Sequence, residues 1–301
     1  MDPTKTMNQV EEGLALLAEG GERVERLLAD SIDWARLPTN LADAARYGVL
    51  GGGKRLRPVL VLTSCGAVSG REKDAEPAAA ALELVHCFSL VHDDLPALDN
   101  DELRRGRPTL HVHSGEPMAI LAGDLMLAMA FGTIAAGPCP PEVRAALVEE
   151  LATGTSEMVA GQVYDTLGGL PPQISPIEQV KLVHRNKTGA LIRAACRMGG
   201  LCGGASSDEL RALTAYGEAM GLMFQIVDDL LDVTQSAEHV GKATGKDAAL
   251  GKRTYPAVLG ESACHEEVER LRSDAVMAAE QLGDGGYPLA CLAEVMAVRT
   301  R

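Results

Sequence analysis

The chain has 301 residues, of which 46% are hydrophobic and only 3% aromatic, and its 28 Lys and Arg against 42 Asp and Glu give a formal net charge of −14. This apolar content supports a large packed core and excludes wholesale disorder. The acidic balance argues against a general polyanion binder, so no nucleic-acid partner is expected, although local basic sites remain allowed. No run of about 18 apolar residues free of charge occurs, and we therefore expect no membrane span.

The N-terminal stretch and the cysteines both bear on the cellular compartment of the protein. The N-terminal stretch MDPTKTMNQVEEG lacks the basic flank and apolar segment of a secretory signal. The seven cysteines are scattered without a CxxC pair, and an odd number cannot all pair within one chain. We therefore expect reduced thiols in a cytoplasmic protein. A zinc site is not favoured, since no His has a Cys partner at zinc spacing.

Long stretches rich in Ala and Leu, which are strong helix formers, repeat with helical periodicity along the chain. An early break lies at 37–40, where Asn40 is the expected N-cap of the next helix. In chain order, the longest predicted helices cover 74–92, 117–136, 142–167, 176–198 and 207–232. Alternating Val, Ile and Thr runs typical of strands are nearly absent.

The breaks between these helices are rich in Gly and Pro, which end helices. They lie at 137–141, 168–172 and 203–207, and two further amphipathic helices joined near 283–286 are predicted after residue 260. No composition shift or internal repeat marks a linker. The sequence therefore predicts one all-α domain over 1–301, in which about 1–10 fray.

The first charged cluster is GGGKRLRP at 51–58. Its glycines let the backbone approach a ligand closely, and Lys54 and Arg57 share one side if a helix begins here. Lys and Arg suit diphosphate oxygens, as a point charge and a fork respectively. The alternative is a glycine turn with solvated basic residues.

The second cluster follows the helix predicted over 74–92. Asp93 and Asp94 fall at its end, Pro96 stops it, and Asp99 is presented from a loop that could swing back toward Asp93. Acids at a helix C-terminus are unfavourable to the helix dipole, so a cation should offset them. Mg²⁺ fits, because it takes oxygen ligands and keeps ligand phosphates in its shell. The alternative is a solvated acidic loop.

The third cluster is FQIVDDLLD at 224–232. Asp228 and Asp232 are four residues apart and share a helical face, which Gln225 joins. Two stacked carboxylates inside an apolar helix repel each other, and a shared divalent ion removes the conflict. The alternative is a solvated face, although the apolar neighbours make that less favourable.

Together these motifs resemble those of the trans-isoprenyl diphosphate synthases, the polyprenyl synthetases, and most of all the bacterial farnesyl diphosphate synthases. The matching segments are GGGKRLRP, DDLPALDNDELRRGRPT, KTG at 187–189, FQIVDDLLD and GKATGKDAALGKRTYP, in the family's order over roughly 42–260. The resemblance implies a single-domain bundle of long helices around a deep central cavity. It also implies a homodimer and three Mg²⁺ ions that bridge the two aspartate motifs through an allylic diphosphate.

The resemblance assigns roles to residues that match the family's motifs. The implied metal ligands are Asp93, Asp94, Asp99, Asp228, Asp229 and Asp232. The implied contacts with the allylic diphosphate are Arg104, Lys187, Thr188, Gln225, Lys242 and Lys252. The implied isopentenyl diphosphate site is the Gly53 backbone with Lys54, Arg57, His86 and Arg105. Arg104, Lys187 and the leading aspartates would be catalytic, and Gln162 and Asp165 of GQVYD would line the cavity.

The implied reaction is a Mg²⁺-dependent, head-to-tail condensation of isopentenyl diphosphate with an allylic diphosphate, first dimethylallyl and then geranyl. The allylic C–O bond ionises as charge on the departing diphosphate is neutralised, the double bond attacks the cation, and a proton is lost. No nucleophile is required, which agrees with the absence of a triad motif. Exclusion of water gives a reason for closure of the loops around 235–252.

Product length is predicted from the helix that ends in Asp93. Ser89 lies four residues and Phe88 five residues before Asp93, so they lie roughly 6–7.5 Å below its carboxylate. A phenylalanine ring there could close the floor of the cavity, and the resemblance to bacterial farnesyl diphosphate synthases then implies a C15 product. The alternatives are a C20 product, geranylgeranyl diphosphate, and an ordinary core role for Phe88.

Two other classes of protein share part of this pattern. A class I terpene cyclase guides its cations with aromatic walls, whereas aromatic residues make up only 3% of this chain. A non-catalytic subunit of a heteromeric prenyl synthase usually lacks part of an aspartate motif, and both motifs are complete here. Both alternatives are therefore less favoured than a catalytic synthase.

Overall fold

The computed structural model describes residues 3–31, 37–234 and 254–298, and within them the chain is almost entirely helical. The principal helices are α1 (Pro3–Ser31), α2 (Thr39–Val49), α3 (Leu56–Ser69), α4 (Glu76–Asp93), α5 (Leu110–Ser114), α6 (Glu116–Ala136), α7 (Pro141–Thr166), α8 (Pro176–His184), α9 (Ala190–Gly203), α10 (Ser207–Thr234), α13 (Tyr255–Leu259), α14 (Glu261–Glu280) and α15 (Tyr287–Val298). Short helical turns occupy Glu72–Ala75, Arg185–Gly189 and Gly283–Gly286. A two-stranded hairpin joins β1 (Leu103–Arg104) to β2 (Arg107–Pro108).

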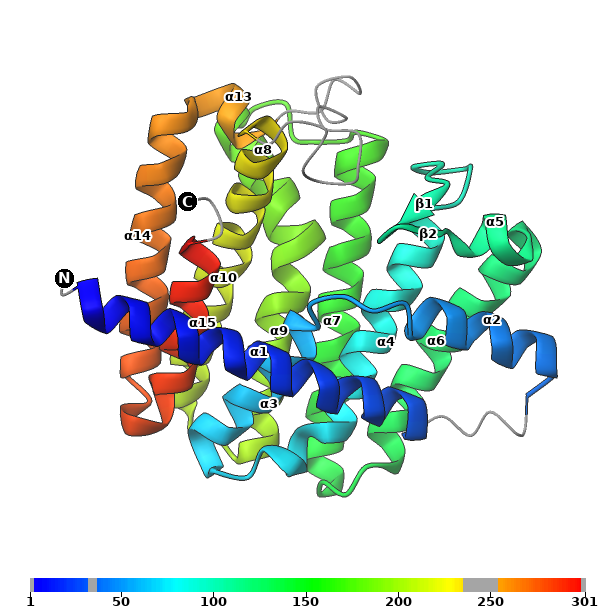
Figure 1. Cartoon of the computed structure of the whole chain (residues 1–301), viewed down its shortest axis with the longest axis horizontal. Helices are drawn as coiled ribbons and strands as arrows, with labels where there is room; N and C mark the ends of the chain where they lie inside the picture. Colours follow the sequence, from blue (N-terminus) through cyan, green and yellow to red (C-terminus); the bar gives the residue numbers. More distant parts are fainter. Residues whose placement is uncertain (1–2, 32–36, 235–253, 299–301) are drawn as a thin grey trace.

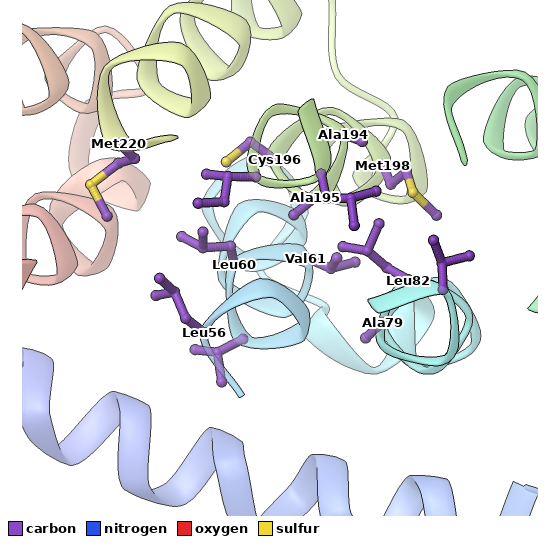
Figure 2. Packing of buried hydrophobic residues seen from close by; sticks show 14 of the residues in the cluster. Leu56, Leu60, Val61, Ala79, Leu82, Ala194, Ala195, Cys196, Met198 and Met220 are labelled. Carbon is purple, nitrogen blue, oxygen red and sulfur yellow. The ribbon is translucent and has the colours of Figure 1, made fainter. Parts of the chain in front are cut away.

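The helices form one bundle, with α3, α4, α9 and α10 at its centre and α1, α6, α7, α14 and α15 around them (Figure 1). Side chains from α3, α4 and α9 meet in a core that includes Leu60, Val61, Leu82 and Met198 (Figure 2). Burying each such side chain contributes about 1.5–3 kcal/mol. The all-α prediction is confirmed.

Glycine sets how closely the central helices approach. A Cβ on Gly199 of α9 would lie 2.2 Å from the Val61 carbonyl oxygen of α3. Real Cβ atoms do not come so close to a backbone oxygen, so only glycine permits this contact between α3 and α9. The pair of helices that carries the middle of the core therefore depends on a residue without a side chain.

The observed helices differ from the predictions in three details. The stretch 176–198 is divided into α8 and α9 by a π-helical turn at Arg185–Gly189. The expected N-cap is also wrong, because Pro38 accepts the first amide bonds of α2 and Asn40 lies inside its first turn. Residues 3–10, which were expected to fray, form the first turns of α1.

Helix α6 is the most apolar of the long helices. By length and composition it is long and apolar enough to cross a membrane, and 33% of its most apolar stretch is buried among the described residues. One such helix is weak grounds for a membrane span, because a helix covered by protein passes the same test. Ile120 and Leu121 are 44% and 56% exposed on its surface, so the residues that the structure describes do not cover these apolar side chains.

The arrangement brings the two aspartate-bearing helix ends to the same end of the bundle. Helices α4 and α10 both run toward the upper end in Figure 1, where the β1–β2 hairpin, α8 and α13 also lie. A cavity of about 330 Å³ opens beside α4, between α4, α7 and the π-helical turn. The fold therefore places Arg57 of the first charged cluster and Asp93 of the second at one hollow.

Candidate active site

The basic cluster before α3 forms a glycine-bordered cradle. Gly52 and Gly53 have φ angles of 76° and 122°, a region that favours glycine. A Cβ on Gly53 would lie 2.4 Å from the guanidinium carbon of Arg105, so Arg105 rests directly on the Gly53 backbone. The prediction that Gly53 and Arg105 belong to one site therefore has a steric basis.

Arg57 and His86 lie beside this cradle with unusually crowded positive charge. Arg57 Nη1 is 3.3 Å from His86 Nε2, and burial followed by the charges of Arg57 and Arg105 lowers the pKa of His86 well below its usual value. Burial lowers the pKa of Arg57 as well. Its buried Nε has no hydrogen-bond partner among the described residues. Donors buried and unpaired among cations indicate a site for an anion.

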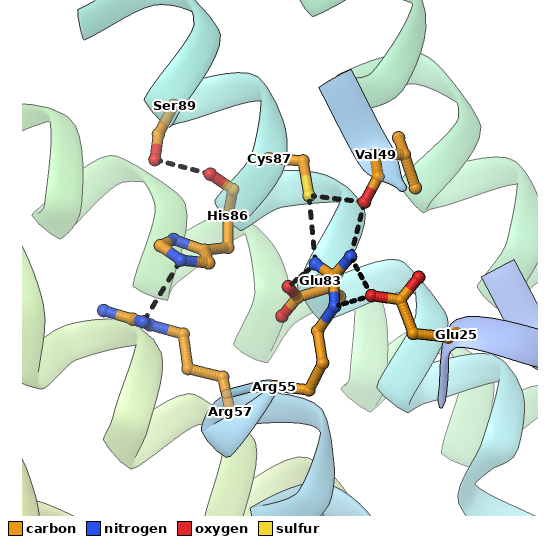
Figure 3. A network of polar contacts seen from close by, with 8 residues as sticks. All are labelled: Glu25, Val49, Arg55, Arg57, Glu83, His86, Cys87 and Ser89. Carbon is orange, nitrogen blue, oxygen red and sulfur yellow. Dashed lines mark hydrogen bonds and ion pairs between the residues drawn. The ribbon is translucent and has the colours of Figure 1, made fainter. Parts of the chain in front are cut away.

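Arg55 was not singled out from the sequence, and it turns inward instead of toward the cradle. Its side chain is buried and donates from Nε to Glu25 at 2.8 Å, from Nη2 to the Val49 carbonyl at 2.6 Å, and from Nη1 to Glu83 (Figure 3). These partners belong to α1, the end of α2 and α4. Arg55 therefore ties three helices to the loop that carries Gly53. The feature of the sequence that could have indicated a buried basic partner is Glu83, an acid inside an otherwise apolar helix.

The described non-glycine residues with positive φ all lie in two segments, the loop before α3 and the loops that follow α4. They are Arg55 (49°), Asn100 (51°) and Arg105 (54°). This left-handed conformation is unfavourable by about 1 kcal/mol or more for a residue with a side chain. Such strain gathers where a loop must present groups to a ligand, which supports the assignment of both loops to a binding site.

The first aspartate motif folds back on itself as predicted. The amide of Asp99 donates to the carbonyl of Asp93 at 2.9 Å, so the loop after α4 returns to the helix end. Burial is the main cause that raises the pKa of Asp93 to about 6; the nearby Lys187 opposes it and the carboxylate of Asp99 adds to it. Asp93 lines the cavity. A partly buried carboxylate beside a second one fits a divalent cation.

Asp94 faces a different neighbour from Asp93. It is buried, and it accepts hydrogen bonds from Arg104 Nε at 2.9 Å and Nη2 at 2.6 Å. The β1–β2 hairpin presents Arg104 for this paired contact. Burial raises the pKa of Asp94 although Arg104 opposes the shift. In the described structure, Asp94 anchors Arg104, and its predicted role as a metal ligand stays a prediction.

The π-helical turn between α8 and α9 aims two predicted ligand contacts at the cavity. Lys187 and Thr188 both line it, and Lys187 Nζ lies 2.6 Å from an oxygen of Asp165. A Cβ on Gly161 of α7 would lie 2.2 Å from the Lys187 amide nitrogen. The π-helical turn therefore packs directly against the backbone of Gly161, where any side chain would clash. Of the two residues of GQVYD expected to line the cavity, Gln162 does so, whereas Asp165 is not among the lining residues and contacts Lys187.

The second aspartate motif divides its acids in the same way as the first. Asp229 is buried and accepts from the Tyr255 amide at 3.0 Å and from Gln225 Nε2 at 3.2 Å. Asp228 and Asp232 are half-buried. Asp228 is close enough to Arg57 to favour its charged form. Lys242, Lys252 and the predicted closure of 235–252 lie outside the described residues.

Contacts across the cavity connect the two motifs. The positive charge of Lys187 is close enough to Asp93 to favour the ionised form of the Asp93 carboxyl. The Thr188 hydroxyl donates to Gln225 Oε1 at 2.8 Å, and Gln225 lies about one helical turn before Asp228. Asp93 lines the cavity itself, whereas the second motif reaches it through the contact of Gln225 with Thr188. Within the part of the chain that the structure describes, no three His, Cys, Asp or Glu side chains converge closely enough to hold an ion without another ligand. Carboxylates set across a hollow suit an ion that also binds phosphate.

The floor of the cavity contains the residues predicted to set product length. Phe88 and Ser89 both line it, together with Met158 and Val159 of α7. Phe88 is 8% exposed, and its ring meets the ring of His92 edge-on at 5.6 Å. The Ser89 hydroxyl donates to the His86 carbonyl at 2.9 Å. An aromatic ring therefore lines the cavity, and its role in setting product length stays a prediction.

Comparison with known proteins agrees with this geometry. The family model described as polyprenyl synthetase matches residues 38–282. The chain belongs to the polyprenyl synthetase family. The protein is 44% identical over 272 residues to geranylgeranyl pyrophosphate synthase 11, chloroplastic, of Arabidopsis thaliana, covering 87% of this chain and 75% of the relative. Prenyl transfer is thus the activity of the family to which the protein belongs.

Solved structures share the fold over nearly the whole chain. An apo FPP/GFPP synthase from Zymomonas mobilis has a TM-score of 0.82 and 30% identity, covering 96% of this chain and 98% of that one. A geranyltransferase from Helicobacter pylori, solved with magnesium and isoprenyl diphosphate, has a TM-score of 0.77 and 30% identity, covering 93% and 94%. The isoprenoid synthase fold predicted from the motifs is confirmed.

Proposed function

We propose that this polyprenyl synthetase makes farnesyl diphosphate by condensing isopentenyl diphosphate with dimethylallyl diphosphate and then with geranyl diphosphate. The observation that carries the C15 product is Phe88, which lines the cavity five residues before Asp93 and is 8% exposed. Five helical residues span about 7.5 Å. A growing chain that enters past Asp93 therefore meets the ring after a short path.

The proposed work of the side chains follows from their positions. Arg57, His86 and Arg105, with the Gly53 backbone, bind the diphosphate of isopentenyl diphosphate. Lys187, Thr188 and Arg104 bind the allylic diphosphate and favour its departure by stabilising the charge that develops on it. The apolar walls from α4 and α7 keep water from the cation. The proton released on condensation passes most simply to the departing diphosphate.

Three Mg²⁺ ions complete the proposal. Asp93, Asp99, Asp228 and Asp232 would supply the oxygen ligands that this ion prefers, and burial, which raises the pKa of Asp93, disfavours its charged form unless a cation lies beside it. Bound Mg²⁺ supplies Lewis-acid neutralisation of the diphosphate leaving group. The magnesium in the Helicobacter pylori relative supports this ion in particular. We also propose a cytoplasmic location and a homodimer.

A C20 product is the second candidate, and one observation favours it. The Arabidopsis thaliana relative at 44% identity is named a geranylgeranyl pyrophosphate synthase. A terpene cyclase is less favoured, because Phe88 is the one Phe, Tyr or Trp among the described residues that line the cavity, and cyclases rely on aromatic walls. The intact motifs argue against a non-catalytic subunit.

Product analysis separates these candidates. The purified protein is incubated with isopentenyl and dimethylallyl diphosphates and Mg²⁺, and the products are dephosphorylated and resolved by chain length. We expect farnesol as the main product. A main product of geranylgeraniol would replace the C15 assignment, and absence of any prenyl alcohol would favour the non-catalytic subunit. A cyclic hydrocarbon formed from farnesyl diphosphate would favour the cyclase.

A further inference from the structure

Asp229 is used differently from the other acids of its motif. Its side chain is buried, whereas Asp228 and Asp232 are half-buried. Both of its carboxylate oxygens accept hydrogen bonds inside the protein, Oδ1 from Gln225 Nε2 at 3.2 Å and Oδ2 from the Tyr255 amide at 3.0 Å. An oxygen that already accepts such bonds in a buried setting has fewer lone pairs to offer an ion.

The first contact fixes the direction of a hydrogen-bond chain. An ionised carboxylate only accepts, so Gln225 must turn its amide nitrogen toward Asp229 and its oxygen toward Thr188. The Thr188 hydroxyl donates to that oxygen at 2.8 Å. Asp229 therefore decides where the proton of Thr188 points, although it does not touch Thr188. Thr188 lines the cavity and is a proposed contact of the allylic diphosphate.

The second contact joins two helices beyond the motif. Tyr255 is the first residue of α13, and its amide has no partner within that helix. Helix α13 packs against α10 and α8 at the upper end of the bundle (Figure 1). His184 of α8 completes the group, with Nε2 3.6 Å from Asp229 Oδ2. Asp229 thus fastens the start of α13 to the helix that carries the second motif.

We infer that Asp229 is a positioning residue, which orients Gln225 and Thr188 and holds Tyr255, and that the metal ligands of this motif are its half-buried neighbours. This inference corrects the expectation that Asp229 binds Mg²⁺ directly. Its meaning for turnover depends on the proposed function, whereas the contacts with Gln225 and Tyr255 can be tested without it.

The kinetic test compares Asp229→Asn with Asp228→Asn. The new amide can still accept from Tyr255, but its nitrogen faces Gln225 and forces that amide to turn around, which reverses the chain to Thr188. We expect the KM for geranyl diphosphate to rise about tenfold, as loss of a good hydrogen bond does, with little change in the Mg²⁺ concentration for half-maximal rate. Asp228→Asn should raise that Mg²⁺ concentration at least tenfold. An equal Mg²⁺ shift in both variants would overturn the inference.

A rescue by a second substitution tests the contact itself. Gln225→Glu alone places two carboxylates side by side and should lower Tm. The double variant Asp229→Asn with Gln225→Glu restores one donor facing one acceptor, and its second carboxylate oxygen again accepts from Thr188. We expect Tm to return toward the value of the unaltered protein; the KM for geranyl diphosphate does not serve as a readout here, because Gln225 is itself an expected contact of the allylic diphosphate. Additive effects of the two substitutions would contradict the inference.

The Tm measurements keep the two proposals distinguishable. If the unaltered protein makes no prenyl product, the proposed function fails while the Tm cycle still reports on the Asp229–Gln225 contact. If the unaltered protein is active and the cycle is additive, the positioning role fails and the proposed function stands. Asp229→Ala, which leaves the Tyr255 amide without an acceptor, should have a lower Tm than Asp229→Asn.

Discussion

At the scale of single residues, Phe88 offers the most direct test of product length. Replacing Phe88 by Ala removes the ring that faces the cavity five residues before Asp93, so the chain can grow further before it is blocked. We expect the main product to lengthen by at least one isoprene unit, as read by chromatography of the dephosphorylated products. Met158→Ala, at another position in the cavity wall, is the matched control. An unchanged product distribution in Phe88→Ala would make Phe88 a core residue only.

The ionised carboxylate of Asp93 is expected to lower the stability of the metal-free protein, although the proposed metal site requires it. Its pKa is raised to about 6, mainly by burial, above the ordinary value of about 4 for Asp. A raised acid pKa means that the folded protein holds this proton more tightly than the unfolded chain, so stability falls as pH rises from about 4 through 6. Asp93→Asn should therefore raise the Tm of the metal-free protein by a few °C at pH 7.5.

The same substitution should change Tm much less at about pH 3, where the carboxyl is mostly protonated in both states. Prenyl transfer should fall by at least a hundredfold at pH 7.5, because a proposed metal ligand is lost. Thermal unfolding at the two pH values measures the first effect. A lower Tm of Asp93→Asn at pH 7.5 would show that the carboxylate is stabilised, not strained, in the metal-free protein.

At the scale of elements, the loop before α3 depends on the buried ion pair of Arg55 and Glu83. Glu83→Leu removes the buried carboxylate partner of the Arg55 guanidinium, which is 3% exposed as a residue and keeps its contacts to Glu25, the Val49 carbonyl and the Cys87 sulfur. Removing one partner of a buried pair destabilises a protein by about 3–5 kcal/mol. We expect the free energy of unfolding, measured by chemical denaturation, to fall by an amount near the lower end of this range. We also expect the KM for isopentenyl diphosphate to rise.

A surface pair provides the control for this substitution. Glu72 pairs with Arg23 and has a side chain that is 42% exposed, so Glu72→Leu should change stability by about 1 kcal/mol or less. Its KM for isopentenyl diphosphate should not change, because Glu72 lies away from the cradle. Equal effects of the two substitutions would mean that the Arg55 pair does not hold the loop.

The sequence predicted helices well and their interruptions less well. Periodicity located α4, α6, α7 and α10 to within two residues, because long amphipathic segments carry a strong signal. The π-helical turn at Arg185–Gly189 escaped prediction, because the contact that favours it involves Gly161 on another helix. A residue distant in sequence leaves no mark on the local pattern.

The candidate site shows the same division. The motifs identified which residues gather, and the return of Asp99 to Asp93 was predicted from Pro96 and the loop length. They did not indicate that Asp94 and Asp229 would be turned inward to hold Arg104, Gln225 and Tyr255. Neighbouring acids on a helix point to different faces, and only tertiary packing decides which face meets the cavity.

At the scale of the whole molecule, the uncovered face of α6 predicts a second copy of the chain. Ile120 and Leu121 are 44% and 56% exposed on a helix whose apolar surface has no partner within the described chain. A contiguous apolar face of this kind marks an interface more often than open surface. We expect Leu121→Lys to shift the protein from dimer to monomer at micromolar concentration, as measured by light scattering after size exclusion.

Loss of the second copy of the chain should also change the active site, because α6 packs against α4, the helix that carries Asp93. His92 Nε2 lies 3.1 Å from the Ile120 carbonyl oxygen, and a Cβ on Gly123 would lie 2.1 Å from the same nitrogen. A small movement of α6 would therefore displace His92 and its neighbour Asp93. We expect Leu121→Lys to lower turnover along with dimer content, whereas Leu103→Lys, at a 63% exposed position on β1, should stay dimeric. A Leu121→Lys protein that remains dimeric would place the interface elsewhere.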